Sequence, residues 1–125
     1  MTATILVVED SLTDMKIISL YLEQAGYVVI SAKSGEEAQE KIDVTPPNLI
    51  FTDVILPGKS GFELCREIKT SFRYNQIPVI LCSTKDTELD RLWGSMLGAD
   101  AYLTKPINQK ELIITLKRLT QKENE

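Results

Sequence analysis

Short apolar runs alternate along the chain with longer segments in which apolar residues recur every three or four positions. Few polar residues interrupt the runs, a pattern that predicts strands covered on both faces. The longer segments have the periodicity of amphipathic helices. The predicted strands occupy residues 4–8, 27–32, 48–52, 79–82 and 101–104, and a predicted helix follows each of them.

A serine or asparagine followed three residues later by an acidic residue marks the start of four of these helices. This pattern is typical of a helix N-terminus, where both side chains pair with free backbone N–H groups. Ser11 with Asp14 predicts a helix over residues 12–25, which ends at Gly26. The other pairs are Ser34 with Glu37, Ser60 with Glu63, and Asn108 with Glu111.

The helix after the fourth strand has a wide apolar face and an interior glycine, Gly94. Because an interior glycine costs about 1 kcal/mol relative to alanine, this is the least stable of the predicted helices. For Trp93 and Met96 we favour packing in the core or on the surface over a role in chemistry. The apolar residues of this face are Leu89, Leu92, Trp93, Met96 and Leu97.

Five strand and helix pairs joined by short connections fit an open doubly wound parallel sheet or a closed barrel. An eight-unit barrel needs roughly 250 residues, and this chain has 125. We therefore expect an α/β fold with an open, doubly wound sheet of five parallel strands. The 43% hydrophobic content suffices for one core, so residues 1–125 should form one domain with a frayed tail at 121–125.

Composition excludes several function classes. The net charge is −4 with no basic block, which argues against direct nucleic-acid binding. No apolar run approaches the roughly 20 residues that span a bilayer, so we expect no membrane insertion and a cytoplasmic location. The absence of histidine removes imidazole catalysis and imidazole metal ligands. Cys65 and Cys82 match no metal-ligand spacing and are expected to be buried free thiols.

Polar residues gather where the predicted strands end. Asp53 closes the apolar run at 49–52 and precedes a loop containing Pro57, Gly58 and Gly61. Because the carboxyl ends of parallel strands meet at one edge of the sheet, these side chains should lie close together. The groups delivered to that edge are Glu9, Asp10, Asp53, Ser83, Thr84 and Lys105.

Three carboxylates in one crevice repel one another unless a divalent cation enters. A set of oxygen ligands without histidine or cysteine favours Mg²⁺ over zinc, and Asp10, Asp53 and a loop carbonyl near Ile55 would suffice because Mg²⁺ keeps several waters. A carboxylate can also attack phosphorus, and Mg²⁺, Lys105 and Ser83 could then meet the charge on the transferred group.

Each of these residues also has a simple structural interpretation. Glu9 and Asp10 could favour a helix N-terminus by about 0.3–1 kcal/mol. Ser83 could be a turn residue, and Lys105 could lie in an ordinary surface loop. Tyr102 is as consistent with core packing as with a functional role. The joint occurrence of complementary groups at one sheet edge favours a functional site.

With these motifs in place, the sequence resembles the receiver domain of two-component response regulators over essentially its whole length. The matching motifs are ILVVED at 5–10, Asp53 with Leu56-Pro57 and Gly61, Ser83, and GADAYLTKP at 98–106. The resemblance implies a flavodoxin-like fold with strand order 2-1-3-4-5. It also implies a cis peptide bond between Lys105 and Pro106.

The resemblance implies a role for each matching residue. Asp53 would accept a phosphoryl group from a phosphohistidine on a sensor histidine kinase or a histidine phosphotransfer protein. Glu9 and Asp10 would bind Mg²⁺ with Asp53 and Ile55, Lys105 would contact the phosphoryl group, and the Ser83 hydroxyl would hydrogen-bond to it.

The resemblance also implies a switch. The phosphoryl group would draw Ser83 inward, and the ring of Tyr102 would rotate and change the partner affinity of the surface formed by helix four, strand five and helix five. Ile55 and Lys85 stand where such domains tune the lifetime of the phosphoryl group. An apolar group at the first position and a cation at the second lead us to expect a long-lived phosphorylated state.

We expect a stand-alone receiver that switches protein contacts, because no effector domain fits after residue 120. It would turn over no outside substrate, would serve motility, taxis or another phosphorelay, and would be a monomer or a weak dimer. The expected contact residues are Leu89, Trp93, Ile113 and Ile114.

Three alternatives remain open. The first, a phosphatase of the haloacid-dehalogenase type, lacks the second aspartate because position 55 is isoleucine. The second, a flavodoxin-like cofactor binder, would meet repulsion from Glu9 and Asp10 at the phosphate position. The third is a receiver that is never phosphorylated and acts as a scaffold, against which the complete set of acids, hydroxyl and lysine argues.

Overall fold

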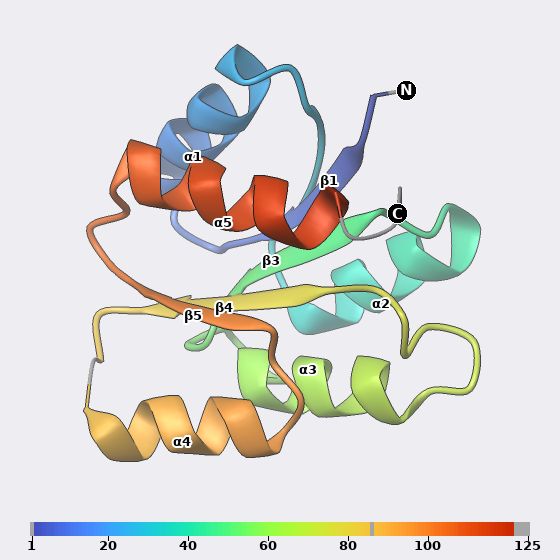
Figure 1. Cartoon of the computed structure of the whole chain (residues 1–125). Helices are drawn as coiled ribbons and strands as arrows, with labels where there is room; N and C mark the ends of the chain where they lie inside the picture. Colours follow the sequence, from blue (N-terminus) through green and yellow to red (C-terminus); the bar gives the residue numbers. More distant parts are fainter. Residues whose placement is uncertain (1, 86, 122–125) are drawn as a thin grey trace.

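The computed structural model describes residues 2–85 and 87–121, and in these ranges the chain forms a central sheet flanked by helices (Figure 1). The frayed tail expected at 121–125 lies, from residue 122 on, outside the described residues, and Gln121 is the last residue of a helix. The elements are β1 (Thr4–Val8), α1 (Leu12–Gln24), β2 (Val28–Ala32), α2 (Gly35–Val44), β3 (Leu49–Asp53), α3 (Gly61–Thr70), β4 (Val79–Ser83), α4 (Glu88–Met96), β5 (Ala101–Thr104) and α5 (Gln109–Gln121).

The five strands pair in parallel in the order β2-β1-β3-β4-β5. The predicted fold class and the flavodoxin-like strand order are therefore confirmed. In register, Val8 pairs with Thr52, Asp53 with Cys82, and Ser83 with Thr104. The carboxyl ends of β1, β3, β4 and β5 consequently meet at one edge of the sheet.

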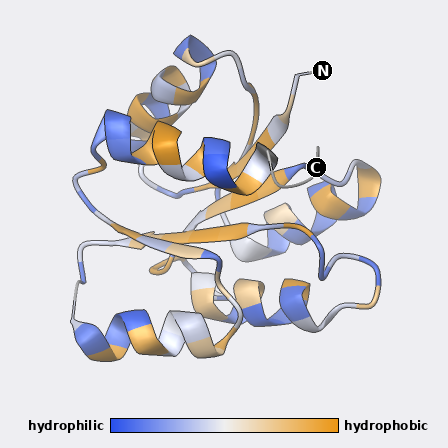
Figure 2. Ribbon diagram, viewed as in Figure 1, coloured by the Kyte–Doolittle hydropathy of each residue, from blue (hydrophilic) through white to orange (hydrophobic). Residues whose placement is uncertain are grey.

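The two faces of the sheet carry separate parts of the core. Along β1, Ile5 and Val7 pack toward α1 and α5, whereas Leu6 and Val8 pack toward α2 and α3. Figure 1 shows α1 and α5 on one face and α2, α3 and α4 on the other. All five residues of β3 and of β4 are buried, and the central strands form an apolar band in Figure 2. This two-sided burial explains why the apolar runs show no alternation with polar residues.

The four predicted helix starts are present. The Ser11 hydroxyl accepts a hydrogen bond from the Asp14 N–H at 3.3 Å, and Ser34, Ser60 and Asn108 cap α2, α3 and α5 in the same way. The strand ends differ slightly, because β3 extends to Asp53 and β4 to Ser83, one residue beyond the prediction. Both residues still pair with the neighbouring strand, so each is held by the sheet itself.

The wide apolar face predicted for α4 is largely exposed. Leu89 is 75% exposed, Leu92 57%, Trp93 48% and Met96 69%, so Leu89 and Trp93 lie at the surface as expected, whereas Leu97, at the helix C-cap, packs against the core. The buried position of this helix is Gly94. A Cβ atom there would lie 3.0 Å from Leu81 Cδ1 and 3.3 Å from Tyr102 Cδ2, so the helix approaches the sheet through its glycine and turns its large side chains outward.

Two further observations concern residues singled out in the sequence. Cys65 and Cys82 are buried free thiols, as predicted. Ile113, a residue of α5 expected at an exposed contact surface, is partly buried and packs against the core, whereas Ile114 is 57% exposed. No helix among the described residues is long and apolar enough to cross a membrane.

Candidate functional site

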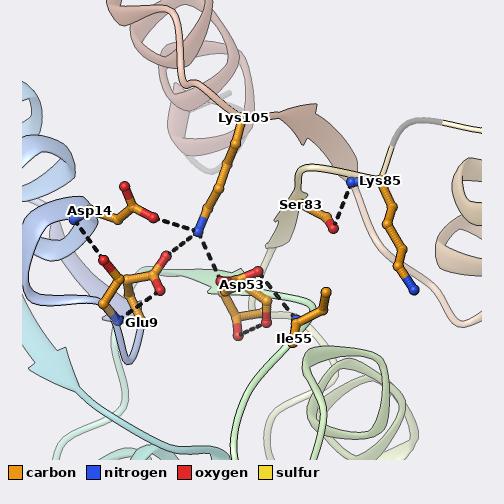
Figure 3. Close-up of polar contacts among 9 residues, drawn as sticks. Glu9, Asp14, Asp53, Ile55, Ser83, Lys85 and Lys105 are labelled. Carbon is orange, nitrogen blue, oxygen red and sulfur yellow. Dashed lines mark hydrogen bonds and ion pairs between the residues drawn. The ribbon is translucent and has the colours of Figure 1, made fainter.

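Residues from three strand ends converge at the carboxyl edge of the sheet (Figure 3). Glu9 and Asp10 follow β1, Asp53 is the last residue of β3, and Lys105 follows β5. One carboxylate oxygen from each of the three acids can be chosen so that all three lie within 4.8 Å of one another. The structure thus brings together the three acids that the sequence predicted.

The ammonium group of Lys105 makes hydrogen bonds to three carboxylates. Its Nζ atom lies 2.6 Å from Glu9 Oε1, 2.9 Å from Asp53 Oδ2 and 2.9 Å from Asp14 Oδ2. An ammonium group has three N–H donors, and each is directed to a different carboxylate in this arrangement. The Lys105 side chain is only 11% exposed, so little water screens these ion pairs.

Burial and charge shift the pKa of two of these groups. Burial raises the pKa of the Glu9 carboxyl, against the opposing effect of hydrogen bonds from Lys105 and from the Ser11 N–H. Burial acts to lower the pKa of Lys105, but hydrogen bonds to Asp53, Glu9 and Asp14 outweigh it and raise that pKa. Lys105 therefore remains a cation at neutral pH and offsets much of the negative charge of the acids.

Most predicted site residues line one open pocket of about 240 Å³. Asp53 Oδ1 accepts a hydrogen bond from the Ile55 N–H at 3.2 Å, and the Ile55 side chain is 53% exposed at the rim. The Lys105–Pro106 peptide bond is cis, as the resemblance implied. The lining residues are Glu9, Asp10, Ser11, Asp14, Asp53, Ile55, Ser83, Thr84 and Lys105.

The donor set fits a hard divalent cation. Glu9, Asp10 and Asp53 present only oxygen atoms, as Mg²⁺ prefers. Glu9 and Asp53 are buried at the base of the pocket, whereas Asp10 is exposed, so the group is open to solvent on one side. A cation with few protein ligands and several waters could be held by these three residues.

Ser83 and Tyr102 both contact the main chain of Lys85. The buried Ser83 hydroxyl accepts a hydrogen bond from the Lys85 N–H at 3.1 Å, and the Tyr102 hydroxyl donates to the Lys85 carbonyl at 2.7 Å. The Tyr102 ring also lies beside Arg91, whose Cζ atom is 5.3 Å from the ring centroid. Among the described residues, the lining of the pocket includes Ser83 and not Tyr102. The loop after β4 therefore connects the pocket to the tyrosine.

Asp14 is a site residue that the sequence interpretation missed. The Ser11 and Asp14 pair was interpreted as a reciprocal cap, but the Asp14 carboxylate binds Lys105, and Glu9 Oε2 accepts from the Ser11 N–H instead. No local pattern marked this role, because the contact between Asp14 and Lys105 joins residues 91 positions apart in the sequence.

Comparisons with known proteins agree with this geometry. A family model described as the response regulator receiver domain matches residues 5–117. Among curated proteins, PilH of Pseudomonas aeruginosa is 36% identical over 114 residues, which cover 91% of this chain and 94% of PilH.

Solved structures show the same likeness. Chemotaxis protein CheY4 of Vibrio cholerae superposes with a TM-score of 0.89 at 31% identity, over 95% of this chain and 99% of CheY4. The receiver domain of a histidine kinase from Syntrophus aciditrophicus superposes with a TM-score of 0.90 at 35% identity, over 97% and 92% of the two chains.

Proposed function

Because the chain belongs to the receiver-domain family of response regulators, we propose that it accepts a phosphoryl group on Asp53 in a Mg²⁺-dependent reaction. The observation that carries this proposal is the joining of Asp53, Glu9 and Lys105 by hydrogen bonds of 2.6 and 2.9 Å inside one open pocket. The family match disfavours the dehalogenase-type and flavodoxin-type alternatives.

Asp53 acts as the nucleophile in this proposal. One of its carboxylate oxygens bonds to phosphorus while the bond from phosphorus to the donor nitrogen or oxygen breaks, and the leaving group keeps that electron pair. Glu9, Asp10 and Asp53, with the backbone of Ile55, would hold a Mg²⁺ ion, which would supply positive charge for the phosphoryl oxygens. One N–H group of Lys105 exchanges its hydrogen bond to Asp53 for one to a phosphoryl oxygen. The Ser83 hydroxyl donates a hydrogen bond to another phosphoryl oxygen.

The main chain of Lys85 connects Ser83 in the pocket with Tyr102 outside it. Ser83 now accepts a hydrogen bond from the Lys85 N–H, and a turn of its hydroxyl toward a phosphoryl oxygen weakens that bond. The loop then shifts, and with it the carbonyl to which Tyr102 donates. A small change of charge at Asp53 thereby biases the position of the tyrosine and of α4.

The partners follow from this chemistry. The phosphoryl donor is a sensor histidine kinase or a histidine phosphotransfer protein, and the output is a protein that binds the α4, β5 and α5 surface. Exposed Leu89, Trp93 and Ile114 supply apolar contacts there. Likeness to the chemotaxis protein CheY4 supports a role in taxis or motility. We further propose that the receiver is cytoplasmic, is a monomer or a weak dimer, and turns over no outside substrate.

Intact-protein mass spectrometry after incubation with acetyl phosphate or phosphoramidate tests this function. The wild-type protein should gain one phosphoryl group in the presence of Mg²⁺ and none in the presence of a chelator. Asp53→Asn keeps the shape of the side chain and serves as the matched control, which should gain none. A folded wild-type protein that forms no adduct with either donor would contradict the proposal and favour the scaffold alternative.

A further inference from the structure

The partners of Lys105 are of two kinds. Glu9 and Asp53 belong to the group of acids that can hold a divalent cation, whereas Asp14 does not. The Asp14 carboxylate is nevertheless as close to Lys105 Nζ as the Asp53 carboxylate, at 2.9 Å in each case. Asp14 is therefore the only partner of this ammonium in the described chain that a cation at the acidic group would leave untouched.

A divalent cation and the Lys105 ammonium compete for the same oxygens. The ammonium bonds directly to Glu9 Oε1 and Asp53 Oδ2, and two cations at such short range repel strongly in a site with little water. Entry of Mg²⁺ must therefore displace the ammonium from at least part of its present position. A buried ammonium that loses its partners is costly unless another acceptor replaces them.

Asp14 is well placed to be that acceptor. Its N–H donates to the Ser11 hydroxyl at 3.3 Å, which fixes the residue in the first turn of α1. Ser11 also donates its N–H to Glu9 Oε2 at 3.1 Å, so one residue holds both the buried acid and the outer acid in place. The Asp14 side chain is 39% exposed against 1% for Glu9, and it therefore keeps contact with water while it exchanges hydrogen bonds with Lys105.

We propose that Asp14 is a positioning residue that holds the Lys105 ammonium beside the site while Mg²⁺ takes the oxygens of Glu9 and Asp53. The inference rests on the Mg²⁺ site of the proposed function and adds a role for a residue outside the cation ligands. Asp14 makes cation entry easier because the displaced ammonium keeps an anionic partner. It also keeps Lys105 within reach of a phosphoryl group on Asp53.

Isothermal titration of the unphosphorylated protein with MgCl₂ tests this role without any phosphoryl transfer. Asp14→Asn should weaken Mg²⁺ binding by about tenfold, the lower end of the losses seen when partners of metal-site residues are removed. Asp14→Glu, which keeps the carboxylate, should stay within about threefold of the wild type. Glu23→Gln removes the same charge from the exposed face of α1 and should change the affinity by less than about twofold, since salt screens distant charges.

A double-mutant cycle separates action through Lys105 from a plain charge effect. In a Lys105→Met background, Asp14→Asn should change the Mg²⁺ affinity by less than about twofold, because no ammonium remains to be held. An equal loss in both backgrounds would overturn the proposal, as would no loss in either, or a loss in Asp14→Glu equal to that in Asp14→Asn.

The outcomes also separate this inference from the proposed function. A wild-type protein that binds no Mg²⁺ would refute the cation site and this inference together. Mg²⁺ binding without an acetyl phosphate adduct would refute the role of Asp53 alone. Mg²⁺-dependent phosphorylation with an unchanged affinity in Asp14→Asn would refute only the role of Asp14.

Discussion

The Nζ atom of Lys105 lies 2.6 Å from Oε1 of Glu9, although the two residues are 96 positions apart in the sequence. Both side chains are nearly inaccessible to water, with exposures of 11% and 1%. The contact joins the strand ends of β1 and β5, which lie on opposite sides of β3 in the sheet. A single ammonium group thus compensates acids that the fold would otherwise bury together.

Replacing Lys105 should destabilise the protein, because it removes the counter-charge of the buried acids. In the absence of divalent cations, we expect Lys105→Met to lower the free energy of unfolding by about 3 kcal/mol, because it leaves Glu9 and Asp53 buried without a counter-charge. Millimolar Mg²⁺ should restore much of this loss and should stabilise the variant more than the wild type, because the competing ammonium is gone. Urea unfolding with and without MgCl₂ measures both effects.

A surface lysine provides the control for that experiment. Lys41 pairs with Glu37 one turn away on α2, and both side chains are 39% exposed. Lys41→Met should cost less than about 0.5 kcal/mol, and Mg²⁺ should not change that cost. An equal loss in both lysine variants, or a loss in Lys105→Met that Mg²⁺ does not reduce, would contradict the compensating role of Lys105.

Gly61 should tolerate no side chain. A Cβ atom there would lie 2.1 Å from the Asp53 carbonyl oxygen and 2.8 Å from Val54 Cα, so the backbone that carries Asp53, the proposed phosphoacceptor, would have to move. We expect Gly61→Ala to cost about 3 kcal/mol and to weaken Mg²⁺ binding, as measured by denaturation and calorimetry. At Gly26, where φ is +93° and no atom lies within 4 Å, alanine should cost only about 1–2 kcal/mol of backbone strain. Similar costs at the two positions would refute this explanation.

Ile55 should protect the phosphorylated state. Its side chain is 53% exposed at the pocket, and its N–H donates to Asp53 Oδ1, so it borders the path of an attacking water. We expect Ile55→Asn to speed loss of the phosphoryl group roughly tenfold, because an amide can orient a water that an alkyl group excludes. Ile55→Val keeps an apolar side chain and should leave the rate nearly unchanged. A wild-type adduct that decays within seconds would contradict the prediction.

Because its thiols are buried, the protein should lose stability in alkaline solution. Burial raises the pKa of Cys65 from 9.0 to about 11, so the native state keeps this proton while the unfolded chain loses it. Stability should fall as the pH rises from 9 to 11, because the native state then binds more protons than the unfolded state. Between about pH 8 and about pH 10.5, the stability of wild type relative to Cys65→Ala should fall by about 2 kcal/mol. Parallel pH curves for the two proteins would contradict this.

The sequence predicted the fold and much of the site because both depend on local patterns. Uninterrupted apolar runs identify buried strands, and a parallel sheet places Glu9, Asp10, Asp53 and Lys105 at one edge. The bond between Asp14 and Lys105 could not be predicted in this way, because it joins residues 91 positions apart and depends on side-chain reach. The helix-capping pattern already explained an acidic residue at position 14, so nothing in the sequence pointed to a further role.

The orientation of α4 shows the second limit of sequence patterns. Periodicity identified its large apolar residues but not the side that meets the sheet, because Gly94 makes that contact. A glycine contributes no hydrophobic signal, so the pattern did not decide whether Trp93 and Met96 pack in the core or on the surface. Their exposure follows from close packing of the Gly94 backbone against Leu81 and Tyr102, which only the tertiary structure shows.

The most direct test of the central claim is to locate the phosphoryl group in the chain. Borohydride reduces an acyl phosphate to an alcohol, so an aspartyl phosphate becomes homoserine, which peptide mass spectrometry can identify. After incubation with acetyl phosphate and Mg²⁺, we expect homoserine at position 53 and at no other position, and none when Mg²⁺ is chelated. Homoserine at position 10 or 14, or a reduced product that forms equally without Mg²⁺, would contradict it.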